Sequence, residues 1–165
     1  PIPITMLSKK IEAALNGLWP AFQRAMWEAS LRRLGLVSRD EEEDSKLVVA
    51  LFAFLRDSGI GYEQFWFDWY GGALSVARAE RSPVADAYRG TAFAPSQELL
   101  TAYAPRPGLR LDHPYFARER PRTMLIDEME ALWAPIAADD DWSAFNTALA
   151  EIDEMRDAYR SGDAP

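Results

Sequence analysis

The chain has 165 residues, the size of one ordinary domain, and 48% of them are hydrophobic, which is enough for a packed core. No apolar run approaches the roughly 20 residues that a membrane-spanning helix needs, and no segment has the pattern of a signal peptide. The 26 acidic and 18 basic residues give a net charge of −8, which argues against nucleic acid and anionic membranes as partners. The absence of cysteine excludes disulfides and thiolate metal sites, and it fits a cytoplasmic location.

The first helical pattern covers residues 6–36. Its apolar positions repeat at helical spacing and are Leu7, Ile11, Leu15, Leu18, Phe22, Met26, Leu31 and Leu34. We expect Pro20 to divide or kink this helix, because proline lacks a backbone donor and clashes with the preceding turn. Gly35 is the expected C-terminal cap, and Arg32 and Arg33 in the last turn favour the negative end of the helix dipole.

A second helix is predicted after an acidic connector at residues 38–44. Asp40 or Asp44 can cap its first turn, and the apolar positions that follow are Leu47, Val48, Leu51, Phe52 and Leu55. Gly59 and Gly61 then separate this helix from the next one. Because no further glycine and no strand accompany these two glycines, we interpret them as a turn rather than a phosphate-binding loop.

The aromatic stretch at residues 62–70 is the most unusual local feature. It predicts a short helix whose buried face consists of Tyr62, Phe65, Trp66 and Trp69. Phe67 and Tyr70 fall off that face, so three alternatives are open for them: burial in the core, docking of another domain or subunit, or a ligand pocket. We take Phe67 and Tyr70 as the candidate interface residues.

The middle of the chain has weaker signals. Between residues 71 and 89 no clear periodicity is present, and a helix is predicted at 96–103. Residues 104–121 contain breakers too closely spaced for a regular element, namely Pro105, Pro107, Gly108, Pro114 and Pro121. This segment is therefore predicted to be an irregular connector.

Two more helices are predicted at the C-terminal end. Pro121 suits the first turn of a helix that ends near Pro135, and the acids at 139–141 can cap a last helix. The sequence thus predicts an all-α fold, a compact bundle of about six helices with a proline-rich irregular connector. We expect a single helical domain at 1–159 and a polar tail at 160–165.

Few residues have the spacing that catalysis or metal binding requires. His113 is the single histidine and the chain has no cysteine. We therefore interpret it as a loop residue that satisfies backbone groups rather than a zinc ligand. The carboxylates of Asp127, Glu128 and residues 139–141 could serve a small helical enzyme. Helix capping and exposure to solvent are the simpler interpretation of these acids.

A cluster of basic residues at Arg118, Arg120 and Arg122 could bind an anion. In a chain this acidic, exposed or ion-paired side chains are the preferred interpretation. From the residues alone we therefore assign no catalytic, cofactor-binding or metal-binding residue.

Three segments occur in an order that one known family shares. Residues 31–36 read LRRLGL, as at the end of a helix in that family, and residues 44–65 contain an acidic turn, a leucine-rich helix and a Tyr-x-x-Phe element. Residues 121–145 then contain Pro-Arg, paired acids, a short acidic turn and a phenylalanine-containing helix. This order resembles the C-terminal region of the selenoprotein O family, the kinase-like protein adenylyltransferases.

The resemblance covers most of residues 20–155, with local departures. Gly61 replaces the usual aspartate before the tyrosine, Trp66 replaces the usual arginine after the phenylalanine, and Thr123-Met124 stands where Asn-His is typical. The terminal cysteine or selenocysteine motif of many members is absent.

The resemblance implies a specific role. Members bind ATP and magnesium in an inverted orientation within a pseudokinase core and transfer AMP to hydroxyl side chains of proteins, and that core precedes the region matched here. We therefore expect this chain to be a C-terminal helical domain that supports an upstream kinase-like core and shapes access for protein substrates as further partners, and that neither binds ATP-magnesium nor transfers AMP alone. The alternative is an independent interaction module, with a homodimer as one form of it.

Overall fold

The structure is a computed structural model that describes residues 4–160, and between residues 4 and 14 it describes only one side chain, that of Glu12. Within these residues it is all-α, which confirms the predicted class. The α-helices are α1 (Ile4–Leu34), α2 (Glu41–Ser58), α3 (Tyr62–Asp68), α4 (Val76–Arg81), α5 (Ala85–Arg89), α6 (Ala94–Thr101), α7 (Ile126–Asp139) and α8 (Ser143–Ala158). Short 3₁₀ turns occur at Gly72–Ser75 and Pro114–Ala117. None of these helices combines the length and the apolar character needed to cross a membrane.

The count of eight α-helices in the described chain exceeds the expected six because residues 71–89 are helical. This segment forms α4 and α5, which have six and five residues. Helices this short contain too few turns for a periodic apolar pattern, so neither could be predicted from hydrophobic spacing.

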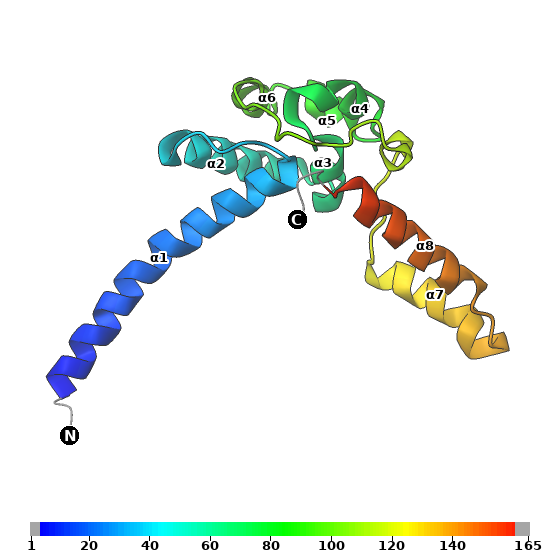
Figure 1. The fold of residues 1–165 in the computed structure, drawn as a ribbon, viewed down its shortest axis with the longest axis horizontal. Helices are drawn as coiled ribbons and strands as arrows, with labels where there is room; N and C mark the ends of the chain where they lie inside the picture. Colours follow the sequence, from blue (N-terminus) through cyan, green and yellow to red (C-terminus); the bar gives the residue numbers. More distant parts are fainter. Residues whose placement is uncertain (1–3, 161–165) are drawn as a thin grey trace.

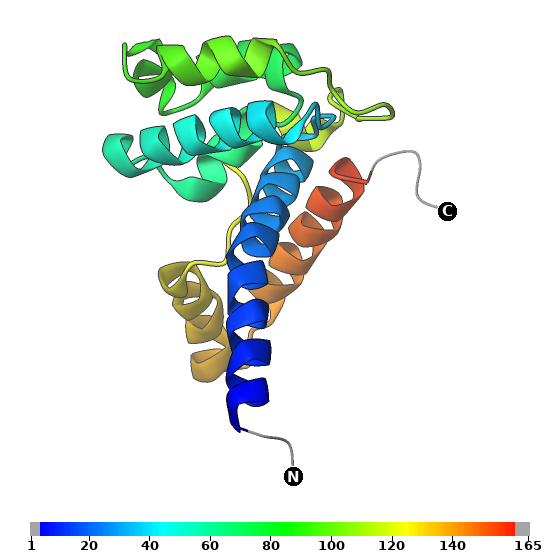
Figure 2. The ribbon, with the colours of Figure 1, turned by 90° about the vertical axis from the view of Figure 1, so that its left-hand side faces the viewer.

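The molecule has a central part and two projecting parts (Figure 1). Helices α2 to α6 form the central part, and α6 packs along α2, as the turned view in Figure 2 shows. The N-terminal portion of α1 extends away from this centre, and so does the antiparallel pair of α7 and α8. The predicted tail beyond Arg160 lies outside the described residues.

Helix α1 runs through Pro20 without dividing, which corrects one of the two expected outcomes for this proline. At its other end Gly35 has a φ of 64°, and the amide of Leu36 donates a hydrogen bond of 2.9 Å to the carbonyl of Leu31. This is the glycine cap that the sequence predicts. It turns the chain sharply toward α2.

Two aspartates near the start of α2 have different structural roles. Asp40 is the N-cap, and its side chain accepts a 2.9 Å hydrogen bond from the amide of Glu43. Asp44 is buried instead and accepts hydrogen bonds from the hydroxyls of Ser38 and Tyr103. Of the two predicted caps, Asp40 is therefore the observed one, while Asp44 ties α2 to the end of α6.

The core consists of two clusters of buried side chains. The central cluster joins α1, α2, α3 and α6 and includes Leu34, Leu47, Leu51, Phe65, Trp66, Trp69, Phe93 and Leu100. The second cluster lies on the other side of α3 and consists of Phe67, Tyr70, Tyr115, Phe116 and Ala158. Helix α3 is thus packed between them.

The connector at 104–121 is irregular apart from the 3₁₀ turn, as predicted. Helix α7 begins at Ile126 rather than near Pro121, and Glu128 caps it by accepting hydrogen bonds from the Leu125 amide and the Thr123 hydroxyl. It continues through Pro135 to Asp139, so the expected end at this proline is wrong. A 2.9 Å hydrogen bond from the Ser143 amide to Asp141 then starts α8.

Candidate functional site

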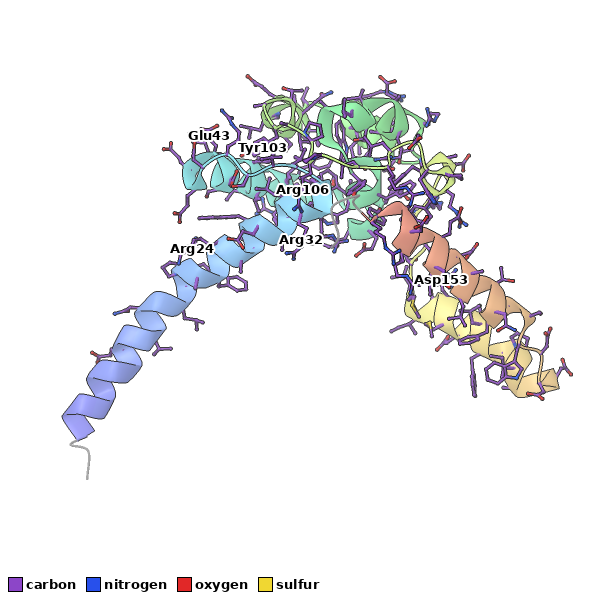
Figure 3. All side chains as sticks on the ribbon, viewed as in Figure 1. Arg24, Arg32, Glu43, Tyr103, Arg106 and Asp153 are labelled. Atoms are coloured by element: carbon purple, nitrogen blue, oxygen red, sulfur yellow. The ribbon has the colours of Figure 1, made fainter. Side chains whose placement is uncertain are left out.

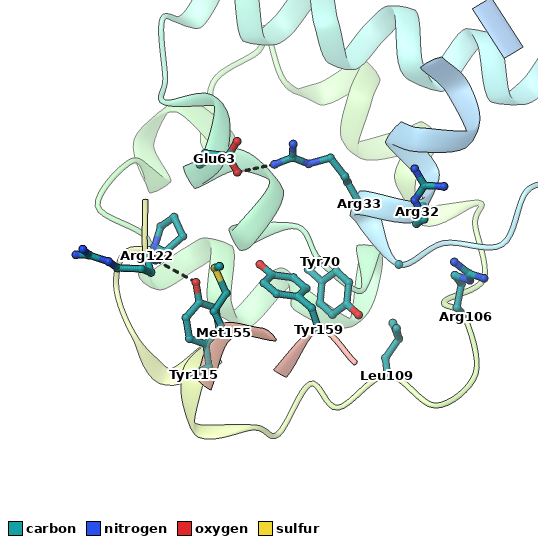
Figure 4. Close-up of a pocket in the computed structure, with 12 residues that line it drawn as sticks. Arg32, Arg33, Glu63, Tyr70, Arg106, Leu109, Tyr115, Arg122, Met155 and Tyr159 are labelled. Carbon is teal, nitrogen blue, oxygen red and sulfur yellow. Dashed lines mark hydrogen bonds and ion pairs between the residues drawn. The ribbon is translucent and has the colours of Figure 1, made fainter. Parts of the chain in front are cut away.

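A pocket of about 450 Å³ lies where the end of α1, α3, the connector and the end of α8 meet (Figure 4). This size is within the range of ligand sites. The residues that line it are Arg32, Arg33, Gly35, Glu63, Tyr70, Arg106, Leu109, Tyr115, Pro121, Arg122, Met155 and Tyr159. We call it the tyrosine pocket.

Backbone pairing between two distant turns builds one edge of the tyrosine pocket. Leu36 and Pro105 form an isolated antiparallel bridge, the Arg106 amide donates a 2.7 Å hydrogen bond to the Gly35 carbonyl, and the Val37 amide donates one of 2.9 Å to Ala104. These bonds hold the connector against the cap of α1. They bring Arg106 to the same edge as Arg32, as Figure 4 shows.

Three tyrosines line the pocket. The Tyr115 hydroxyl accepts a 3.0 Å hydrogen bond from the Arg122 amide. Burial raises the pKa of Tyr70, Tyr115 and Tyr159 above the ordinary value, so all three are protonated at neutral pH. Tyr70 and Tyr159 form no side-chain hydrogen bond within the described chain, which leaves their hydroxyls available to a ligand.

The charge of the lining is positive, with four arginines against one glutamate. Arg33 is neutralised by Glu63 at 2.5 Å and lies over the rings of Tyr62 and Trp66. Arg122 is 3.6 Å from a carboxylate oxygen of Glu151. Arg32 was expected only to interact with the helix dipole. Arg106 could not be recognised from the sequence, because the connector that places it beside Arg32 has no regular pattern.

The candidate interface residues Phe67 and Tyr70 are 1% and 5% exposed, so of the three alternatives left open for them the structure shows burial in the core and no exposed docking face. The connector folds back across α3, and Phe116 stacks on Tyr70 with ring centroids 5.4 Å apart. Tyr115 contacts Phe67 edge to face at 5.6 Å. This chain thus covers both side chains itself, and Tyr70 also lines the tyrosine pocket.

Tyr62 is more exposed than the sequence predicts. It was expected on the buried face of α3 but is 44% exposed. Its position in the first turn of α3 places it at the rim, where the Arg33 guanidinium lies 5.1 Å from its ring centroid.

The single histidine has the backbone role that the sequence suggests. Nδ1 of His113 accepts a 3.2 Å hydrogen bond from the Tyr115 amide and so caps the 3₁₀ turn. Its Nε2 lies 3.3 Å from Asp157.

The predicted arginine cluster does not form one anion site. Arg118 pairs with Glu151 and Glu154 on α8, and Arg122 also faces Glu151. For these two arginines the ion-paired interpretation is confirmed.

The carboxylates considered for catalysis are dispersed. Asp127 and residues 139–141 are exposed, and Glu128 is engaged in capping α7. In the part of the chain that the structure describes, no group of three or more histidine, aspartate or glutamate side chains could hold a metal ion.

A second surface feature lies on the projecting parts. Exposed apolar side chains follow one another on α1 at helical spacing, namely Leu15, Leu18, Trp19 and Phe22. A second group lies on α7 and the residues before it, namely Met124, Leu125, Ile126, Met129 and Trp133. We call these the α1 stripe and the α7 stripe. No residue of α7 is buried.

The comparisons with known proteins identify the family. A family model described as protein adenylyltransferase SelO matches residues 1–153, which include α1 to α7 and most of α8. Neither the comparison with curated proteins nor that with solved structures found a match. Because the family model spans nearly the whole chain, this chain belongs to the SelO family of protein adenylyltransferases.

Proposed function

We propose that this chain is the C-terminal helical domain of a cytoplasmic protein adenylyltransferase and supports an upstream kinase-like core. In this proposal the core binds ATP and magnesium and transfers AMP to hydroxyl side chains of protein substrates, and this chain is not catalytic alone. Family membership supports the reaction class. The two apolar stripes support the role, because they are surfaces that this chain leaves uncovered.

The α1 stripe is the observation that carries the proposal. Trp19 and Phe22 stack with ring centroids 5.7 Å apart and are 63% and 54% exposed. Burying a large apolar side chain contributes about 1.5–3 kcal/mol, so a row of four exposed ones is typical of a surface that packs against another protein part.

The α7 stripe and the charge of the α7 and α8 pair indicate which kind of partner surface to expect. Residues 126–158 contain ten carboxylates and one arginine. A surface of the core that covers Ile126, Met129 and Trp133 would therefore be apolar at its centre and basic around it. In Figure 1 both stripes belong to helices that project from the central part, where a large partner can reach them.

The test is association in trans. The segment encoded upstream in the same reading frame is produced separately and titrated with this chain in a calorimeter. We expect Phe22→Ser to weaken the association at least about tenfold, since it removes roughly 2 kcal/mol of burial. Leu74→Ser is the control, because Leu74 is also an exposed large apolar residue but lies on the central part. Equal loss from both variants would contradict the proposal.

The alternative, an independent module that pairs with a second copy, makes a different prediction. In that case the chain alone sediments as a dimer, Trp19→Ser dissociates it, and the upstream segment does not bind. Sedimentation of the isolated chain therefore separates the two functions before any activity is measured.

A further inference from the structure

Arg32 and Arg106 form a ridge between two pockets. Both residues line the tyrosine pocket, and both also line a second pocket of about 490 Å³. The remaining residues of the second pocket are Glu28, Leu31, Leu36, Val37, Ser38 and Pro107. The two guanidinium groups therefore stand at the boundary of two partly apolar hollows, near the end of α1 (Figure 3).

Neither guanidinium is neutralised by the described part of this chain. No carboxylate there lies within 4.0 Å of Arg32 or Arg106, although Glu63 and Glu28 line the two pockets and Glu63 is engaged by Arg33. Most other arginines of the chain have a carboxylate partner. Two positive charges on one edge repel each other, so an anion that binds between them would relieve the repulsion.

The ridge is held in place by backbone bonds rather than by its own side chains. The Leu36–Pro105 bridge and the hydrogen bond from the Arg106 amide to Gly35 fix the two segments. A Cβ at Gly35 would come within 3.0 Å of both Leu109 and Tyr70, so the segments are in close contact. A site organised before binding loses less entropy when a ligand arrives.

We propose that this ridge binds an acidic segment of another polypeptide, with one carboxylate between Arg32 and Arg106 and an apolar side chain in each pocket. Guanidinium groups bind carboxylates with paired hydrogen bonds. In an extended segment, side chains two positions apart point to the same face about 6.5–7 Å apart. The expected pattern is thus apolar-x-acid-x-apolar.

The two pockets favour a polypeptide over a free anion. A small anion would use only the two guanidinium groups and leave both hollows empty. The tyrosine pocket offers Leu109, Met155 and the free hydroxyls of Tyr70 and Tyr159, whereas the second pocket offers Leu31 and Leu36. This binding goes beyond the proposed function, because it needs neither ATP nor an upstream core.

The test uses the 165-residue chain and the peptide SFSESLS with blocked ends in a calorimeter, at about 50 mM salt, where surface charges are weakly screened. The same peptide with Gln in place of Glu is expected to bind at least about tenfold more weakly, because the charge-assisted hydrogen bonds are lost. Replacing Phe and Leu of the peptide by Ser is expected to weaken binding to a similar extent.

Variants of the chain locate the site. Arg32→Gln and Arg106→Gln are each expected to weaken peptide binding about five- to tenfold, and Arg24→Gln is the matched control, expected within about twofold. Arg24 is an exposed arginine of α1 that lines neither pocket. The thermal midpoint of each variant is measured, and each is expected to remain folded.

Four outcomes would overturn the inference. These are no binding of the peptide, equal binding of the Glu and Gln peptides, equal loss from Arg24→Gln and Arg32→Gln, and displacement of the peptide by inorganic phosphate at the peptide's own concentration. The last two would indicate bulk charge and a general anion site, respectively.

Discussion

The hydroxyl of Tyr88 donates a 2.8 Å hydrogen bond to Oδ2 of Asp68, a carboxylate with no exposed surface. Ser82 donates to the same oxygen at 2.6 Å, and Gln64 donates to the other oxygen at 2.9 Å. Because Gln64 and Asp68 belong to α3, Ser82 follows α4 and Tyr88 belongs to α5, this network joins three short helices. Buried polar groups with complete partners specify one arrangement of the elements around them.

Removing one donor should destabilise the fold. Tyr88→Phe leaves Asp68 with one partner fewer, and we expect a loss of about 1–3 kcal/mol in the free energy of unfolding, measured with urea. Tyr62→Phe is the control, because the Tyr62 hydroxyl has no hydrogen bond within the described chain and its side chain is partly exposed. The same loss in both variants would contradict a specific role for the network.

The buried carboxylate also predicts a pH dependence. Burial raises the pKa of Asp68 above its ordinary value of 3.8, although hydrogen bonds from Ser82, Tyr88 and Gln64 oppose the shift. The folded state therefore binds the proton more tightly than the unfolded state, so this group stabilises most below pH 3.8 and its contribution falls as pH rises through the folded pKa.

Asp68→Asn has no such titration and provides the comparison. As pH rises above 3.8, the unfolding free energy of the natural chain should fall relative to that of this variant. Urea titrations at a series of pH values measure it. A difference that is constant with pH, or that shifts in favour of the natural chain, would show that the Asp68 pKa is not raised.

The burial of Trp66 and Tyr70 in different clusters makes two substitutions comparable. Trp66→Ala and Tyr70→Ala should each lower the free energy of unfolding by about 3–5 kcal/mol, because each leaves a cavity in one of the two clusters. Leu74→Ala, at a 64% exposed position, should change it by about 0.5 kcal/mol or less. A small effect of Tyr70→Ala would show that the second cluster is not formed.

Gly72, after the end of α3, and Gly17, within α1, should respond oppositely to substitution by alanine. Gly72 has a φ of +57°, and a Cβ there would lie 2.7 Å from Leu36. Gly72→Ala should therefore destabilise the chain by about 1–3 kcal/mol. Gly17→Ala, within α1 with nothing within 4 Å of the added Cβ, should stabilise it by roughly 0.5–1 kcal/mol. Thermal unfolding distinguishes the signs, and equal signs would contradict this geometry.

The parts of the fold that depend on neighbouring residues could be predicted from the sequence. Gly35 and Asp40 act as helix caps because the stretch of chain beside each residue decides its conformation. The burial of Phe67 and Tyr70 could not be predicted, because Tyr115 and Phe116 of the 3₁₀ turn, which are distant in the sequence, cover them.

The candidate site also depends on contacts between distant residues, which could not be predicted from the sequence. The charge of Arg32 and Arg106 is visible in the sequence, but their proximity depends on one bridge between an irregular connector and the cap of α1. The exposure of the α1 stripe could not be predicted either, because an amphipathic pattern shows which face is apolar and not what covers it.

In the proposed function, this chain supports AMP transfer by an upstream kinase-like core. The most direct measurement is the labelling of protein with radioactive AMP from ATP and magnesium by the upstream segment alone, by this chain alone and by their mixture. We predict no labelling by this chain, weak labelling by the upstream segment, and a clear increase in the mixture that Phe22→Ser reduces and Leu74→Ser does not. Labelling by this chain alone, or a mixture no more active than the upstream segment, would contradict the account.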